Sequence, residues 1–352
     1  MKRIILMLAV VLGCMTAVAQ KLDKNEMKQL QAFLAQPAEQ GGTNAQALGI
    51  SDLKNAASWE GVTVADGHVT AIEWKDKHLA GSMNLSNFSN LAKLDVSRNR
   101  ITDLNLSGDA ALADLNASRN RLTAINLTGC TGLYVVKIYK NRLTDFSISA
   151  TPAIKTLNVS NNYLVELNVA NSATLETLNC QGNHLEVLNV DDCTNLKNLY
   201  CGYNKITSLN LTGVTNLKNL NIDDNEIDNL ILSGLPSLSS FICSDNNMQS
   251  LVVRDCKSLL DLVCSYNNLT NLTVENCPQL LFVDCCYNDL TQLTLSNQTF
   301  LQRLLCNNNQ LTMLDVSFDP ALTYINCRYN MIADLRTIGD NSLSMVACQW
   351  NY

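Results

Sequence analysis

The sequence predicts a strand-rich solenoid, a fold in which one short unit is repeated along a single axis. An asparagine recurs every 21 residues without a gap, thirteen times from Asn99 to Asn351. Leucine or isoleucine stands eight residues before each of these asparagines, from Leu91 to Leu343. A fixed period of this length is the signature of solenoids, in which each unit buries its apolar face against its neighbours.

The strand within each unit is predicted by where the apolar residues fall. We number the positions 1 to 21, with Leu259 at position 1 of the copy LLDLVCSYNNLTNLTVENCPQ. Apolar residues occupy positions 1, 4, 11, 14 and 16, a small residue occupies position 6, and the asparagine occupies position 9. Because side chains alternate along a strand, positions 4 and 6 face the core and positions 3, 5 and 7 face outward. We therefore expect one strand per coil, stacked in parallel on the next.

The asparagine at position 9 has a structural explanation. Its amide carries two donors and an acceptor. A buried copy can therefore satisfy backbone groups of its own coil and of the neighbouring coil, which a leucine could not do.

Residues 1–19 have the features of a secretory signal. Lys2 and Arg3 precede the apolar run IILMLAVVLG, and Ala-Val-Ala at 17–19 predicts cleavage before Gln20. The alternative is a lipobox ending at Cys14, which Leu12 fits poorly. We expect an exported protein, either secreted or at the cell surface, and the periplasm remains an option.

Residues 20–66 do not fit the repeat and predict an N-terminal cap, so the solenoid is expected to span 67–352. Asp23 followed by Glu26 indicates a capping box that opens a helix. The apolar face of that helix is expected to comprise Met27, Leu30, Phe33 and Leu34. A terminal coil needs its open core covered, and we expect Trp59 to pack against the first coil.

The pattern LxxLxLxxNxL resembles that of bacterial leucine-rich-repeat proteins. It is most similar to the 21-residue, cysteine-bearing repeats of the internalin class and of related secreted Bacteroidetes proteins, over about 260 residues from Leu91 onward. The resemblance implies an α/β leucine-rich-repeat horseshoe with a parallel sheet on its concave side and short extended or 3₁₀ segments on its convex side. It also implies export and recognition of a protein or glycan, often at a host surface.

The cysteines are expected to be reduced core residues rather than a disulfide framework. Position 6 holds Cys180, Cys201, Cys243, Cys264, Cys285, Cys306, Cys327 and Cys348. The remaining coils place Val, Ala or Ile there, as expected of a small buried site. At position 19, only Cys256 and Cys277 lie on neighbouring coils, which leaves a bridge between them open. Cys286, at position 7, is expected on the concave surface as a free thiol.

Composition and motifs argue against catalysis and against several classes of ligand. The net charge is −7 without a long basic run, which disfavours nucleic acid and anionic membranes. No segment after residue 19 has 18 consecutive apolar residues, so no membrane insertion is expected. There is no GxSxG elbow, phosphate loop or zinc-protease spacing, and we expect no enzyme activity, cofactor or metal. Calcium is an alternative at one cluster that also suits a solvated patch: Asp223, Asp224, Glu226 and Asp245.

Candidate binding residues are found in the variable positions of the predicted sheet. The later coils carry an aromatic surface, which we define as Tyr200, Tyr203, Tyr266, Phe282, Tyr287, Arg303, Tyr324, Arg328, Tyr329 and Trp350. Aromatic residues and arginine are enriched in binding sites, although stacked rings can also simply stabilise a sheet.

The early coils carry a second candidate, a basic surface defined as Lys93, Arg98, Arg119, Arg121, Lys137 and Lys140. Stacked like charges suggest an anionic ligand such as an acidic glycan. The simpler interpretation is a solvated face balanced by aspartates, among them Asp95 and Asp114.

The sequence thus favours an exported, non-enzymatic recognition module whose protein or glycan ligand binds the concave face. The alternative is a structural or self-assembling surface protein that associates through its C-terminal coil, because Asn351 is followed by Tyr352 alone and that coil does not close. The open coil is also consistent with Met345, Trp350 and Tyr352 folding over it, or with an incomplete sequence.

Overall fold

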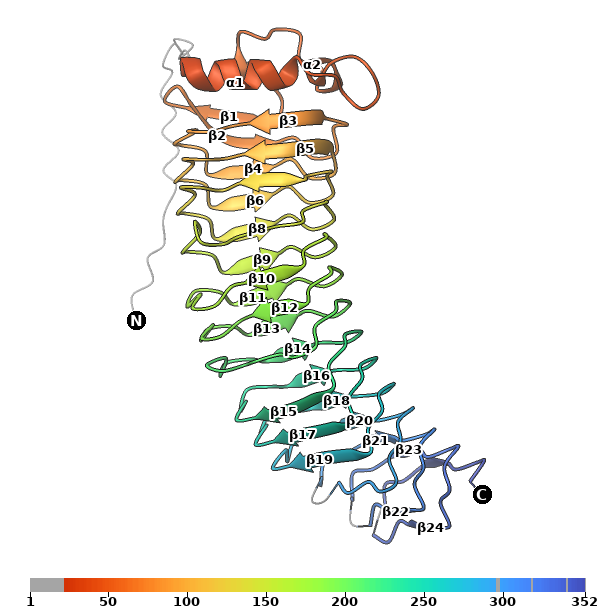
Figure 1. Cartoon of the computed structure of the whole chain (residues 1–352). Coiled ribbons are helices and arrows are strands. Elements are labelled where there is room, and N and C mark those ends of the chain that lie inside the picture. The colour runs from red at the N-terminus through yellow and green to blue at the C-terminus, as the bar shows by residue number, and fades with distance from the viewer. Residues whose placement is uncertain (1–21, 296–297, 318, 340, 352) are drawn as a thin grey trace.

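The computed structural model describes residues 22–351 apart from 296, 297, 318 and 340, so the expected signal and Cys14 lie outside the described residues. A helical segment covers one end of a long, curved stack of coils (Figure 1). The helices are α1 (Lys24–Leu34), α2 (Asn44–Ala47) and the 3₁₀ helix η1 (Ala56–Ser58).

The main sheet runs the length of the solenoid and has 15 strands within the described residues. Its first two strands pair antiparallel and every later pair is parallel, with partners 21 residues apart throughout the repeats, as Leu262 and Val283 are. The strands are β1 (Val62–Ala65), β2 (His68–Glu73), β4 (Lys93–Asp95), β6 (Asp114–Asn116), β8 (Val135–Lys137), β9 (Thr156–Asn158), β11 (Thr177–Asn179), β13 (Asn198–Tyr200), β14 (Asn219–Asn221), β16 (Ser240–Ile242), β18 (Asp261–Val263), β20 (Phe282–Asp284), β21 (Arg303–Leu305), β23 (Tyr324–Asn326) and β25 (Met345–Ala347). The sequence period is therefore the register of the sheet.

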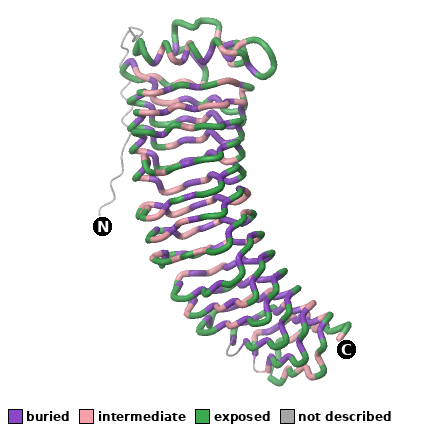
Figure 2. Tube along the Cα trace, viewed as in Figure 1, coloured by how far each residue is buried: buried purple, intermediate pink, exposed green. Residues whose placement is uncertain are grey.

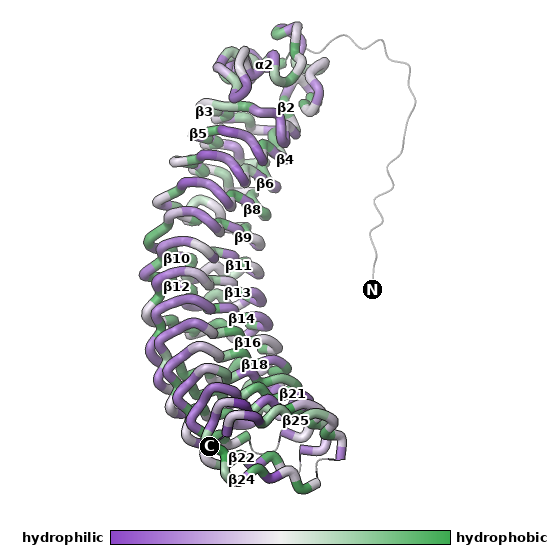
Figure 3. The backbone as a smooth tube through the Cα atoms, turned by 90° about the vertical axis from the view of Figure 1, so that its right-hand side faces the viewer, coloured by the Kyte–Doolittle hydropathy of each residue, from purple (hydrophilic) through white to green (hydrophobic). Residues whose placement is uncertain are grey.

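Shorter sheets form on the opposite side of the coils, from positions 13 to 15 and their flanking residues. They comprise β3 (Ala80–Asn84), β5 (Arg100–Asn105) and β7 (Ala124–Asn126); β10 (Glu166–Asn168) and β12 (Val187–Asn189); β15 (Asn229–Ser233), β17 (Ser250–Arg254) and β19 (Asn271–Glu275); and β22 (Met313–Asp315) and β24 (Asp334–Arg336). Figure 3 shows the main sheet on the inner side of the curve and these strands on the outer side. The predicted horseshoe with extended convex segments is confirmed.

The core is a continuous column between the two sets of strands. In the coil that begins at Leu259, all the side chains at positions 1, 4, 6, 11, 14 and 16 are buried. Figure 2 shows the same alternation of buried and exposed residues in coil after coil. Each coil therefore depends on its neighbours for most of its buried surface.

The position-9 asparagines form the expected ladder, and Asn225 shows its geometry. Its Nδ2 donates to the carbonyl of Ile222 in its own coil and to that of Cys201 in the preceding coil, at 3.1 Å each. Its Oδ1 accepts the backbone N–H of Ile206 at 3.0 Å, also in the preceding coil. Each asparagine thus bridges its own coil to the preceding one.

The N-terminal helix differs from the expectation at one residue. Asp23 caps α1 by accepting the backbone N–H groups of Asn25 and Glu26, as predicted. The carboxylate of Glu26 does not complete a capping box. It is buried and instead accepts the backbone N–H of Val69 at 2.8 Å and contacts the His68 ring at 3.0 Å. Glu26 thereby joins the helix to β2 at the head of the sheet.

Aromatic residues join the helical segment to the first coil. Phe33 of α1 stacks on Trp74 with ring centroids 6.3 Å apart, and both residues are buried. Trp59 is also buried, as expected, and its Nε1 donates to the Asp52 carbonyl at 2.8 Å.

The cysteine ladder at position 6 is present with free thiols. Seven of its eight members are buried, and Cys348, in the last coil, is exposed. Burial raises the pKa of Cys180 to about 12 and that of Cys327 to about 11. These residues therefore fill the core as small neutral side chains, as the column predicted.

Asp109 is a buried carboxyl group at the convex end of the first full coil. One oxygen accepts the backbone N–H of Phe88 at 2.8 Å, and the other, Oδ2, has no partner. Burial raises the pKa of Asp109 from 3.8 to about 7. The folded state holds this proton more tightly than the unfolded state does. The stabilisation that the Asp109 proton contributes is therefore fully present below the unfolded pKa and is lost as pH rises through the folded pKa near 7.

Asp109→Asn should remove this loss. We expect a higher thermal midpoint than wild type at pH 8, by roughly 2–4 °C for each kcal/mol regained, and no gain near pH 4. Asp228→Asn, which changes an exposed carboxylate, is the matched control. Equal pH profiles for Asp109→Asn and wild type would show that Asp109 is not the responsible group.

Candidate functional site

The later strands of the main sheet display a row of side chains at position 3 on the concave face. Phe282, Arg303 and Tyr324 stand side by side on β20, β21 and β23. The guanidinium carbon of Arg303 lies 5.3 Å from the Phe282 ring centroid and 5.7 Å from the Tyr324 ring centroid. The two rings hold the arginine in place by cation–π contact, and its charge has no ion-pair partner within the described residues. We call this group the arginine row.

Two stacked pairs of rings occupy position 8, three residues after the ends of β18, β20, β23 and β25. Tyr266 and Tyr287 have ring centroids 4.4 Å apart and an interplanar angle of 9°. Tyr329 and Trp350 lie 6.0 Å apart at 6°. All four side chains are 45–56% exposed, so the stacking leaves about half of each available for contact.

The backbone at position 8 is left-handed in every coil. Twelve non-glycine residues have φ between 49° and 64°, and Gly182 has φ 65°. The hydrogen bonds of the turn impose this conformation: the N–H of Tyr266, for example, donates to the Cys286 carbonyl of the next coil at 3.0 Å. A left-handed backbone costs about 1–2 kcal/mol for most residues, less for Asn or Asp, and nothing for Gly.

The remaining members of the aromatic surface lie apart from these groups or beside them. Tyr200 is half-buried on β13, and Tyr203 is exposed three coils before Tyr266. The negative charge of Asp223 beside the Tyr203 hydroxyl raises the pKa of that tyrosine. Arg328 is half-buried at position 7, and its Nε donates to Gln349 at 2.5 Å. The structure therefore divides the predicted surface into an outlying pair and one group on the last five coils.

Sequence reasoning missed the apolar floor between the arginine row and the stacked pairs. Ile242, Val263 and Leu305 occupy position 5 on β16, β18 and β21 and are half-buried. The alternation rule assigns position 5 to the same face as position 3, so the signal was present, but only aromatic and charged residues were selected. The floor is interrupted by Asp284 on β20 and Asn326 on β23, so apolar residues alternate with polar ones along position 5.

The basic surface is only partly neutralised. Lys93 pairs with Glu73, and the Arg119 guanidinium lies 5.9 Å from the Tyr139 ring centroid. Within the described part of the chain, five of its members are exposed and form no ion pair: Arg98, Arg119, Arg121, Lys137 and Lys140.

Asp95, one of the aspartates expected to balance the basic surface, accepts hydrogen bonds from Ser97. The Asp95 carboxylate accepts the backbone N–H and the hydroxyl of Ser97, at 2.9 and 2.6 Å. Its charge remains on this face: after the hydrogen bond to Glu73, the charges of Asp114 and Asp95 also raise the pKa of Lys93, as expected of a solvated face balanced by aspartates.

Cys286 is not the exposed thiol that the sequence predicted. It lies on the concave side but is buried, and its Sγ–H donates to Asn307 Oδ1 at 2.8 Å. Burial and the neighbouring Asp284 carboxylate raise its pKa. An outward-facing position is thus buried, with Asn307 of the next coil against it.

The described residues show no arrangement typical of a metal centre. They contain no group of three or more His, Cys, Asp or Glu side chains placed to hold a metal ion. In the acidic cluster, Asp223 is half-buried and burial raises its pKa, whereas Asp224, Glu226 and Asp245 are exposed. None of the helices in the described part of the chain is long and apolar enough to cross a membrane.

The 21-residue coils, the parallel concave sheet and the asparagine ladder define a leucine-rich-repeat solenoid. No model of a known protein family and no curated protein matches the sequence. Several solved structures do match. The PEPR1–AtPEP1 structure is 21% identical, covering 88% of this chain and 52% of its own, with a TM-score of 0.65. A leucine-rich-repeat protein of Leptospira interrogans is 18% identical, covering 77% and 78%, with a TM-score of 0.52.

The functional domain of InlJ from Listeria monocytogenes, which includes a cysteine ladder, is 26% identical, with coverage of 71% and 68% and a TM-score of 0.49. At the level of fold, the resemblance to bacterial leucine-rich-repeat proteins is confirmed.

Proposed function

We propose that this protein is a non-enzymatic binding module whose ligand, a protein or a glycan, occupies the concave face of the last six coils. The footprint comprises the arginine row, the two stacked pairs and the apolar floor. Solenoids of this fold include partners in protein complexes, such as PEPR1 with AtPEP1 and LRIM1 with APL1C. The leader at residues 1–19 supports export, to the medium or the cell surface.

The observation that carries this proposal is the choice of residues at position 8. Several earlier and intervening coils relieve the left-handed backbone there with Gly182, Asn161 or Asn308. The late coils instead place bulky rings on it and leave them half exposed. Stacking is worth about 0.5–1.5 kcal/mol per pair, which is no more than the conformational cost of two such residues. Stability alone therefore gives little reason for these rings, whereas a binding surface does.

The basic surface supports a second site on the early coils, for an anionic ligand, because most of its positive charges lack ion-pair partners. Binding through it should weaken steeply with salt, whereas binding through the aromatic surface should change little.

A combined array of glycans and matrix proteins, probed with the chain from Gln20 onward, tests the proposal. We expect a specific hit that persists at 0.5 M salt. A blank from a folded, monodisperse sample would overturn the proposal. The alternative of self-assembly through the C-terminal coil would then be tested by sedimentation, and a concentration-independent monomer would exclude it.

A further inference from the structure

The structure contains a cysteine pair that is separate from the core ladder. Position 19 holds Cys130, Cys193, Cys256 and Cys277, and only the last two are on adjacent coils. We propose that Cys277 and Cys256 form a redox-active dithiol, in which Cys277 attacks a small-molecule disulfide and Cys256 then closes a protein disulfide.

The backbone brings the two residues within bridging distance. Strands β17 and β19 pair residue by residue as far as Arg254 and Glu275, and each cysteine follows its strand by two residues. Parallel neighbours are about 4.8 Å apart, and disulfides need Cα atoms about 4.4–6.8 Å apart. The residues before the cysteines, Asp255 and Asn276, have φ of 58° and 54°, so the chain has left strand geometry where the thiols lie.

The two sulfur atoms make different hydrogen bonds from the other cysteines of this column. Unpaired cysteines of this column donate to the carbonyl 24 residues earlier: Cys130 to Leu106 at 3.0 Å, and Cys193 to Val169 at 3.1 Å. For Cys277 the same contact, to Val253, lengthens to 3.9 Å. Cys256 and Cys277 instead donate to the carbonyls two residues before them, Arg254 at 3.6 Å and Glu275 at 3.3 Å, so both have left the arrangement of the unpaired cysteines.

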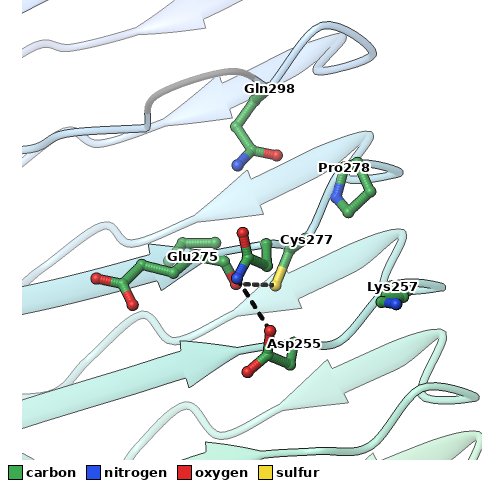
Figure 4. Close-up of a pocket in the computed structure, with 8 residues that line it drawn as sticks. Asp255, Lys257, Glu275, Cys277, Pro278 and Gln298 are labelled. Carbon is green, nitrogen blue, oxygen red and sulfur yellow. Dashed lines mark hydrogen bonds between the residues drawn. The ribbon is translucent and has the colours of Figure 1, made fainter.

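The surroundings make the two thiols unequal. A pocket of about 580 Å³ is lined by Cys277 but not by Cys256, with Lys257, Glu275 and Pro278 among its walls (Figure 4). Both cysteines are buried, and the pocket brings a reagent nearer to Cys277 than to Cys256. The neighbouring Cys256 thiol also lowers the pKa of Cys277, and the pKa of Cys256 is raised. The pocket and the lowered pKa both favour Cys277 as the attacking residue, because the thiolate is the nucleophile.

The chemistry is a thiol–disulfide exchange with oxidised glutathione as the representative oxidant. The Cys277 thiolate attacks one sulfur, the glutathione S–S bond breaks, and one glutathione leaves as a thiolate that takes a proton from water. Cys256 loses its proton to water, attacks the Cys277 sulfur of the mixed disulfide and displaces the second glutathione. The protein loses two electrons and two protons, and oxidised glutathione becomes two molecules of glutathione.

The remaining described thiols should not compete, with one exception. Cys243, Cys264 and Cys285 are fully buried in the ladder, and burial raises their pKa values. Cys348 is exposed and is the expected side reaction. The test therefore uses a Cys348→Ser background.

Folded protein from Gln20 onward, in that background, is treated with oxidised glutathione, quenched with acid, alkylated in denaturant and mapped by mass spectrometry. We expect a Cys256–Cys277 cross-linked peptide, with Cys277 reacting on the order of tenfold or more faster than the thiols of the core ladder. Adding Cys256→Ser should stop the reaction at one glutathione on Cys277. Adding Cys277→Ser should give neither adduct nor cross-link.

Circular dichroism before and after treatment verifies that the fold persists. A different cross-link would overturn the proposal. So would an adduct on Cys256 in the Cys277→Ser protein, or oxidation that begins only once the protein unfolds. If a serine variant at 256 or 277 fails to fold, the presence or absence of the Cys256–Cys277 cross-link in the Cys348→Ser protein still tests the proposal.

Discussion

Asn225→Leu is expected to lower the stability of the solenoid by roughly 2–6 kcal/mol. Leucine has a similar volume but no hydrogen-bonding groups. The N–H of Ile206 would lose its partner inside the stack, and the carbonyls of Cys201 and Ile222 would each lose one of two asparagine donors, keeping Asn204 and Asn246 respectively. An unsatisfied buried group costs about 1–3 kcal/mol, and each lost hydrogen bond about 0.5–1.5 kcal/mol. Because coils are held only by their neighbours, the defect should also uncouple the two halves of the array.

Urea unfolding followed by circular dichroism measures this effect. We expect a lower midpoint and a shallower slope than wild type, since fewer coils would unfold together. Asn247→Leu, one coil further along at the exposed position 10, is the matched control and should change stability by no more than about 0.5 kcal/mol. An unchanged midpoint for Asn225→Leu would show that the ladder does not hold the coils together.

Alanine at Tyr266, Tyr287 and Tyr329 together should abolish ligand binding without unfolding the protein. Residues at the centre of a binding site typically contribute about 2 kcal/mol or more each, so we expect affinity to fall at least ~100-fold. The fold should persist because these side chains are about half exposed and lie outside the core. Alanine in the left-handed backbone is strained about as much as tyrosine, so that term cancels.

The control for the triple variant removes exposed rings elsewhere. Tyr134 and Tyr163 are 47% and 49% exposed, outside positions 3 to 8. Each also has a partner, Lys155 at 5.1 Å from the Tyr134 ring centroid and His184 stacked on Tyr163 at 5.8 Å. Alanine at both should leave affinity unchanged when measured by calorimetry. Equal affinity in the triple variant would remove the proposed footprint.

The architecture could be predicted because the repeat period has one structural solution. A 21-residue period that never slips sets Leu262 beside Val283 and each asparagine beside the next, so the register follows directly. The capping box was wrong because Glu26 has a competing partner. The N–H of Val69 is distant in sequence and is brought beside α1 only by the fold.

The candidate site was less predictable because its backbone conformation and the burial of its side chains depend on contacts between coils. The residues at position 8 include Arg119, Tyr266 and Trp350, which carry no signal for a left-handed conformation. That conformation follows from hydrogen bonds to the next coil. Similarly, alternation places Cys286 on the outward face, but Asn307 of the adjacent coil covers it. Facing outward does not make a side chain exposed.

Tyrosine-specific oxidative footprinting of the complex tests the central claim most directly. Free and ligand-bound protein are modified briefly, and the extent of reaction is measured at each tyrosine by mass spectrometry. The account predicts that Tyr266, Tyr287 and Tyr329 become protected on binding, while Tyr134 and Tyr163 react as before. Unchanged reactivity at the first three tyrosines, in protein saturated with ligand, would contradict it.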